Sequence, residues 1–158
     1  MQENTQRTNA FGSVFKIIVL TLTAVAAGTA TAAEHVVKML NEGDSGQMVF
    51  EPSFLKVDVG DTVVFTPEQA GLHNTHATFM PEGAEGWTSE PDTEFKVTLS
   101  TEGVYLYVCQ PHVVFGMVGV IQAGEAVNKD AAAEAVAAAN SELAMNPDRF
   151  NEAFANVE

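Results

Sequence analysis

Short apolar segments separated by turn signals recur along most of the chain, and this pattern constrains the fold more than any other feature. Several segments alternate apolar and polar residues, as Phe95-Lys96-Val97-Thr98-Leu99 does, which is typical of strands with one buried face. The predicted strands cover residues 35–40, 47–50, 54–57, 62–66, 94–100, 104–108 and 117–122. About seven short strands at this spacing predict a mainly β chain folded as a Greek-key antiparallel β-sandwich.

The C-terminal part differs in composition and predicts two α-helices after the last strand. Residues 130–139 are mostly alanine, a strong helix former, and Asp130 is placed to cap this helix. Asn146 followed by Pro147 predicts the start of a second helix with an apolar face. That face consists of Phe150, Phe154 and Val157. We expect both helices to pack against the sandwich, and a separate interaction tail is the alternative.

The N-terminal region predicts a secretory signal peptide. Arg7 and Lys16 precede an apolar run over residues 17–27, and a small-residue cleavage pattern ends at Ala32. The apolar run is shorter than the roughly 20 residues that a membrane-spanning helix needs. We therefore expect export to the periplasm with cleavage near Ala32–Ala33, and no membrane insertion afterwards. The predicted organisation is a signal peptide over residues 1–32, a sandwich over residues 33–124 and a helical extension over residues 125–158.

The chain is strongly acidic. It has 21 Asp and Glu residues against 7 Lys and Arg residues, for a formal net charge of −14. Such a surface argues against nucleic acids and anionic membranes as partners. Two interpretations of the charge stay open: solubility in a salty medium, or electrostatic attraction of a basic partner.

The only cysteine lies in a segment with the spacing of a metal-binding loop. Cys109, His112 and Met117 follow the pattern Cys-x2-His-x4-Met between two predicted strands. A thiolate and imidazoles in a trigonal arrangement, with a weak axial thioether, are typical of electron-transfer copper sites. A second histidine is needed, and His73 and His76 are both candidates. The alternative is a buried, inert cysteine, which the spacing disfavours.

Several segments together resemble a known family. They are residues 38–41, 48–52, 60–63, 73–74, 81–85, 103–105, 109–112 and 116–119. On these segments the chain resembles the cupredoxins, the small blue copper proteins, and among them the pseudoazurins. The helical extension after the last strand is also similar to the pseudoazurins.

The resemblance implies a ligand set and a function. One type 1 copper ion would be bound by His73, Cys109 and His112, with Met117 as the long axial ligand, and His76 would be a surface residue. The chain would carry electrons and would not be an enzyme. A periplasmic copper-binding or copper-delivery protein is the alternative function.

The resemblance also implies an electron port at the exposed edge of His112, ringed by Pro111, Val113, Val114 and Phe115. The expected partners are periplasmic redox proteins, either a c-type cytochrome or a reductase such as copper nitrite reductase, and we expect a monomer. Two departures from the family matter. Gln110 stands between Cys109 and Pro111, where the family usually has Thr. The sequence therefore leaves open whether the usual bridge between Asn74 and the cysteine loop is kept. Glu42 stands where the family has a lysine near the copper.

Overall fold

The computed structural model describes Met1 and residues 32–158, so the predicted signal peptide lies almost entirely outside the described residues. The strands are β1 (Glu34–Gly43), β2 (Gly46–Glu51), β3 (Phe54–Val57), β4 (Thr62–Pro67), β5 (His76–Phe79), β6 (Phe95–Thr98), β7 (Gly103–Val108) and β8 (Val118–Ala123). The helices are the 3-10 helices η1 (Gln110–Phe115) and η2 (Asn140–Glu142) and the α-helices α1 (Lys129–Ala139) and α2 (Arg149–Phe154). No helix within residues 32–158 has the length and apolar character to cross a membrane.

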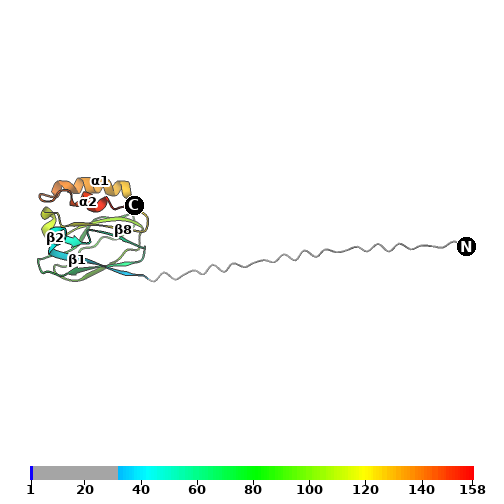
Figure 1. Ribbon diagram of the computed structural model, residues 1–158, viewed down its shortest axis with the longest axis horizontal. Coiled ribbons are helices and arrows are strands. Elements are labelled where there is room, and N and C mark those ends of the chain that lie inside the picture. The colour runs from blue at the N-terminus through cyan, green and yellow to red at the C-terminus, as the bar shows by residue number, and fades with distance from the viewer. Residues whose placement is uncertain (2–31) are drawn as a thin grey trace. The chain divides into compact units, whose positions relative to one another are not determined.

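The strands form two four-stranded sheets that face each other, and the helices cover one of them (Figure 1). One sheet has the order β2-β1-β4-β6, and the other has the order β3-β8-β7-β5. This arrangement confirms the predicted β-sandwich with C-terminal helices.

The pairing within the sheets is mixed. Four strand pairs are antiparallel, but β1 with β4 and β3 with β8 run parallel. The parallel pair β1–β4 arises because β3, which lies between β2 and β4 in the chain, belongs to the other sheet. When the chain returns to the first sheet as β4, it runs in the same direction as β1. The expectation of an antiparallel sandwich holds for the other four pairs.

One strand, β5, was not predicted from the sequence. It has only four residues, and its register against β7 shifts between Ala77 and Phe79. Its four residues alternate polar and apolar side chains, but so short a run, in which only Ala77 is buried, does not by itself predict a strand. It is the edge strand of its sheet, and its pairing with the inner strand β7 fixes it in place.

Aromatic rings fill the space between the two sheets. The ring of Tyr107 lies at centroid distances of 4.8 Å from Phe50 and 5.1 Å from Phe65, both in edge-on geometry. Such geometry adds to the stability that burial alone provides. This core extends to Cys109 and Met117, so the predicted metal-binding segment is anchored in it.

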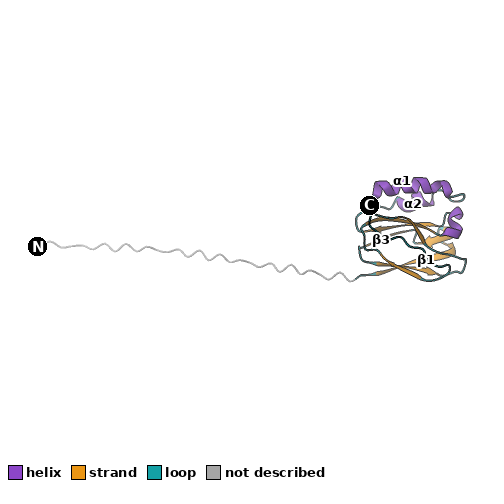
Figure 2. Ribbon diagram, turned by 180° about the vertical axis from the view of Figure 1, so that it is seen from behind, coloured by secondary structure: helices purple, strands orange, loops and turns teal. Residues whose placement is uncertain are grey.

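The helices α1 and α2 lie together on one side of the sandwich (Figure 2), and a second apolar layer lies between them and the strands β7 and β8. Leu106 and Val120 from the strands pack in it with Val136 of α1 and Phe150 of α2. Because β7 and β8 are covered on both faces, all their residues are buried. The helices therefore pack on the sandwich, as expected, and do not form a separate tail.

Both α-helices begin at residues other than those predicted. The cap position of α1 is Asn128, and Asp130 lies inside the first turn. The cap position of α2 is Asp148, because Asn146 has a left-handed backbone with φ of 51°. The side chains of both asparagines bond to distant backbone, Asn128 to Val104 and Asn146 to Phe115. These tertiary bonds decide the helix starts.

Candidate metal centre

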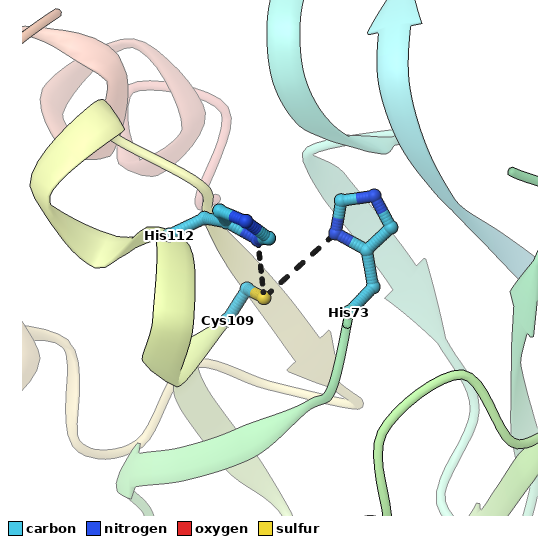
Figure 3. Close-up of side chains that lie close together, drawn as sticks. All are labelled: His73, Cys109 and His112. Atoms are coloured by element: carbon cyan, nitrogen blue, oxygen red, sulfur yellow. Dashed lines mark hydrogen bonds between the residues drawn. The ribbon is translucent and has the colours of Figure 1, made fainter. Parts of the chain in front are cut away.

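Three side chains with metal-binding atoms meet at one end of the sandwich (Figure 3). The Sγ of Cys109 lies 3.3 Å from Nδ1 of His112 and 3.9 Å from Nδ1 of His73. The three ligand atoms all lie within 4.8 Å of one another. The structure thus brings His73 together with Cys109 and His112, which lie in one loop 36 residues or more further along the chain.

His73 is held by Asp92 on its backbone. The Asp92 carboxylate accepts hydrogen bonds from the N–H groups of Gly71, Leu72 and His73, at 3.2, 2.9 and 3.0 Å. Leu72 takes a left-handed conformation in this turn, with φ of 60°. The turn places the fully buried His73 ring toward Cys109.

The imidazole of His73 is oriented by Asn41. Nδ2 of Asn41 donates to the carbonyl of Ala70, so its Oδ1 faces His73 and accepts from Nε2 at 2.9 Å. Because Nε2 carries the hydrogen, Nδ1 is left with a free lone pair that points to the sulfur. A polar neighbour that fixes the tautomer of a histidine in this way is typical of metal ligands.

Asn74 joins the two loops that carry the cluster. Its backbone N–H donates to Cys109 Sγ at 3.4 Å, and its side chain exchanges two hydrogen bonds with Gln110. Gln110 N–H donates to Asn74 Oδ1 at 2.9 Å, and Asn74 Nδ2 donates to Gln110 Oε1 at 2.8 Å. The bridge is therefore kept although Gln110 replaces the usual Thr, because the amide oxygen of Gln110 accepts the bond.

The helix η1 brings Met117 back to Cys109. The N–H of His112 donates to the carbonyl of Cys109 at 3.0 Å, and Gly116 ends the helix with a left-handed φ of 79°. Cys109 N–H then donates to the carbonyl of Met117 at 2.9 Å, and Met117 is fully buried. The loop is thus closed by backbone bonds between its first and last residues.

Burial determines the charge state of these groups. It raises the pKa of the Cys109 thiol and lowers the pKa values of His73 and His112. Burial therefore favours the neutral form of each group in the metal-free protein, and a cation that binds there replaces the thiol proton. One thiolate and two imidazole nitrogens are a donor set that fits copper.

His76 lies outside the cluster. It is on β5, where its Nδ1 lies 2.7 Å from the Thr88 hydroxyl oxygen, and it is half-buried. Of the two candidate histidines, the geometry selects His73.

The apolar surface beside His112 is broader than the sequence indicated. Pro111, Val114 and Phe115 are exposed, whereas Val113 is half-buried and packs on the second apolar layer. Leu72 and Met145 are also exposed, at 65% and 53%. Leu72 could have been assigned to this surface from the sequence, because it directly precedes the candidate ligand His73. Met145 comes close because its N–H donates to the carbonyl of Val114, a contact that no local pattern shows.

Comparison with known proteins gives consistent results. A family described as "Copper binding proteins, plastocyanin/azurin family" matches residues 37–124. The chain is 43% identical to a putative pseudoazurin of Rhizobium leguminosarum bv. viciae over 70% of this chain and 74% of that protein. It is also 43% identical to the pseudoazurin of Paracoccus pantotrophus over 64% of this chain and 71% of that protein.

Solved structures show the same similarity at the level of the fold. The structure resembles native pseudoazurin from Hyphomicrobium denitrificans with a TM-score of 0.67, at 34% identity over 79% of this chain and 98% of that one. It resembles pseudoazurin from Methylobacterium extorquens AM1 with a TM-score of 0.66, at 33% identity over 79% of this chain and 99% of that one.

Proposed function

Because the chain belongs to the plastocyanin/azurin family of copper-binding proteins, and within it to the pseudoazurins, we propose that His73, Cys109, His112 and Met117 bind its copper ion. The chain is a type 1 copper protein and an electron carrier, not an enzyme. The observation that supports this ligand set most directly is the approach of both Nδ1 atoms to Cys109 Sγ.

The surrounding residues suit rapid electron transfer. When bound, copper supplies a one-electron couple between Cu(II) and Cu(I). The bond from Asn74 N–H stabilises negative charge on Cys109 Sγ, and Asn41 keeps the His73 ring in one orientation. A centre whose ligands are held before the metal binds needs little rearrangement when the electron moves.

We infer that electrons enter and leave at His112. Its ring is half-buried, and its centroid lies 6.1 Å from that of Phe115, which is exposed together with Pro111 and Val114. Leu72 and Met145 extend this apolar surface. A small apolar surface around the port suits brief docking without tight binding.

The charges around this surface favour a basic partner. Of the five Lys and Arg residues within 32–158, three are paired with carboxylates, and the other two keep their charge but are bonded to backbone carbonyls, Arg149 being half-buried. Lys38, Lys56 and Lys96 contact Glu68, Glu158 and Glu34, Lys129 bonds the carbonyl of Val157, and Arg149 bonds backbone carbonyls. A c-type cytochrome with a lysine-rich docking face therefore fits better than an acidic reductase.

Of three acidic residues considered for the port, one lies near it and two lie far from it. Glu42 follows Asn41, which contacts His73, so Glu42 lies at the copper end of the sandwich. Glu82 and Glu85 follow Pro81, whose ring packs beside Gly103 at the start of β7. Cys109 follows the other end of β7. Six residues of strand separate the two ends by roughly 20 Å, so Glu82 and Glu85 lie far from the port.

We also infer that the chain works in the periplasm. The signal peptide predicted over residues 1–32 supports this, and cleavage near Ala32–Ala33 would leave the sandwich over residues 33–124 and the extension over residues 125–158. Mass spectrometry of the exported protein tests the cleavage site. An N-terminus inside β1 would contradict it.

The ligand set is tested by visible spectroscopy of the copper-loaded protein. Wild type should show the intense visible absorption of a copper–thiolate bond, and Cys109→Ser should abolish it. His73→Ala should also abolish it, whereas the matched variant His76→Ala should not. If His76→Ala loses the colour and His73→Ala keeps it, the ligand assignment is wrong. Copper that passes readily to a chelator, without reversible reduction, would favour the delivery function.

A further inference from the structure

Arg149 collects backbone carbonyls from two separate loops. Its Nη1 lies within hydrogen-bond distance of four carbonyl oxygens, which must share its two hydrogens, and Nη2 reaches a fifth. They belong to Gln47 at 2.8 Å, Met48 at 2.9 Å, Phe115 at 3.3 Å, Gly116 at 3.3 Å and, through Nη2, Ser45 at 3.5 Å. A planar guanidinium is the one side chain that can satisfy so many acceptors at a single point.

Two of these carbonyls lie in the ligand loop itself. Phe115 and Gly116 directly precede Met117, the predicted axial ligand. The chain just before α2 contacts the same loop, since Asn146 Nδ2 donates to the carbonyl of Phe115 at 2.9 Å. The C-terminal extension therefore holds the final turn of the ligand loop from outside.

The other carbonyls lie in the hairpin formed by β1 and β2, that of Ser45 in its turn and those of Gln47 and Met48 at the start of β2. Met48 has a left-handed backbone, with φ of 50°, and packs against the core that contains Cys109 and Met117. Arg149 thus connects this hairpin to the ligand loop, because the same guanidinium bonds the carbonyls of Met48 and Gly116. It is also the only Lys or Arg of residues 32–158 that bonds the ligand loop.

We propose that Arg149 is a positioning residue of the copper centre. Its hydrogen bonds fix the backbone that leads into Met117, and so set how closely the thioether approaches the metal. Its positive charge, half-buried among the carbonyl groups, favours the reduced ion over the oxidised one, because Cu(I) carries less positive charge. This inference rests on the proposed ligand set.

The test compares Arg149→Met, Arg149→Lys and wild type. In Arg149→Met the ratio of oxidised to reduced protein, measured at the wild-type midpoint potential, should rise about threefold or more. The relative intensities of the visible absorption bands should change as well, because the axial contact loosens. In the metal-free protein the amide hydrogen of Met117, which bonds the carbonyl of His112, should exchange faster with solvent. This last readout does not depend on copper.

Lys129→Met is the matched control. Lys129 also lies in the C-terminal extension and donates to a backbone carbonyl, that of Val157, but it does so away from the ligand loop. Its loss should lower stability without changing the oxidised-to-reduced ratio or the absorption bands.

A folded Arg149→Met protein with the wild-type oxidation ratio, absorption bands and Met117 exchange would overturn the proposal. If Arg149→Met does not fold, Arg149→Lys decides, because it keeps the charge but reaches fewer carbonyls. In Arg149→Lys, faster Met117 exchange with an almost unchanged oxidation ratio supports the proposal, and Met117 exchange at the wild-type rate refutes it. A wild-type protein without the copper–thiolate colour would instead refute the ligand set, which separates the two failures.

Discussion

At the scale of single residues, the environment of His73 is built by two side chains that are distant in the sequence. Asp92, 19 residues away, holds the backbone of the turn, and Asn41, 32 residues away, orients the ring. Gly71 is required between them, since a Cβ at this position would clash with Asn41 Oδ1 and would lie 2.8 Å from His73 Nε2. The histidine is thus fixed before any metal binds.

Asn41→Leu should weaken copper binding. The substitution removes the acceptor for Nε2–H of a buried imidazole, and loss of such a partner typically lowers metal affinity about 10- to 100-fold. It should also destabilise the metal-free protein by about 1–3 kcal/mol. Competition with a copper chelator measures the affinity. Gln69→Ala is the control, because Gln69 bonds the backbone of Asn41 and Glu42 without contacting His73. Equal copper affinity in the two variants would contradict the role of Asn41.

The same residues show how far the site could be predicted from the sequence. Cys109, His112 and Met117 lie in one short loop, so their spacing alone indicated a metal site. The choice between His73 and His76 depends on Asn41 and Asp92, and no local pattern shows those contacts. Resemblance to the family indicated His73, and the geometry selects it. The cluster of carbonyls around Arg149 could not be predicted, because the carbonyls come from two segments and Arg149 from a third.

At the scale of the elements, the helical extension is part of the fold. Its apolar face covers β7 and β8, which explains why these strands lack the alternation seen in β6. Continuous apolar runs predicted these strands correctly, and β5 was missed because its pairing with β7, not its own pattern, creates it. The helix starts were missed for a similar reason, since Asn128 and Asn146 bond to distant strands and loops.

Phe150→Ala should strongly destabilise the fold. Phe150 is completely buried in the layer between the helices and the sheet, and truncation of a buried Phe costs about 3–5 kcal/mol. Urea denaturation of the metal-free protein measures this loss in the free energy of unfolding. Phe154→Ala serves as the comparison, because Phe154 is only half-buried and should cost less. Similar costs at both positions would indicate that the helices contribute little specific packing.

Asp61 should make stability depend on acidic pH. Its carboxylate accepts a hydrogen bond from Ala33 N–H at 2.7 Å and lies 2.7 Å from Nε2 of His35. These bonds, that of Ala33 first, lower the pKa of Asp61 below its ordinary value of about 3.9. The stabilisation is therefore complete above that value and is lost as the pH falls through the lowered pKa.

The variant Asp61→Asn tests this dependence. Its melting temperature should fall below that of wild type by a constant amount between about pH 5 and pH 7, and the difference should shrink below about pH 4. Calorimetry across this range measures it. A difference that persists unchanged at the lowest pH would show that the charge of Asp61 does not matter.

At the scale of the whole molecule, copper should raise stability without being needed for folding. Ligand binding to the native state alone adds about 4 kcal/mol at a thousandfold excess over Kd. The two apolar layers are held together by side-chain packing between the sheets and beneath the helices, so the metal-free sandwich should still fold. Circular dichroism with and without copper should show the same secondary structure and a higher melting temperature with copper. An unfolded metal-free protein would contradict this expectation, and Cys109→Ser should show little stabilisation by copper.

The net charge of the molecule should affect how it meets its partner. The port end carries Glu42, the nearby Arg149 is half-buried against backbone carbonyls, and Lys38, Lys56 and Lys96 are paired with carboxylates, so a basic partner should be attracted to it. Attraction between opposite charges accelerates association at low salt and weakens as ions screen it, with a Debye length of about 8 Å at physiological ionic strength. Stopped-flow electron transfer to a basic cytochrome c, measured over a salt series, should therefore slow steeply as salt is added.

Two acidic positions separate local attraction from overall charge. Glu42→Gln should slow the reaction at low salt more than Glu82→Gln, because Glu82 lies at the opposite end of β7 although both variants change the net charge equally. The difference should disappear at high salt, where screening removes both contributions. Equal effects would show that only the total charge acts. A rate that stays constant or rises with salt would refute the attraction, and docking would then depend on the apolar surface around His112 alone.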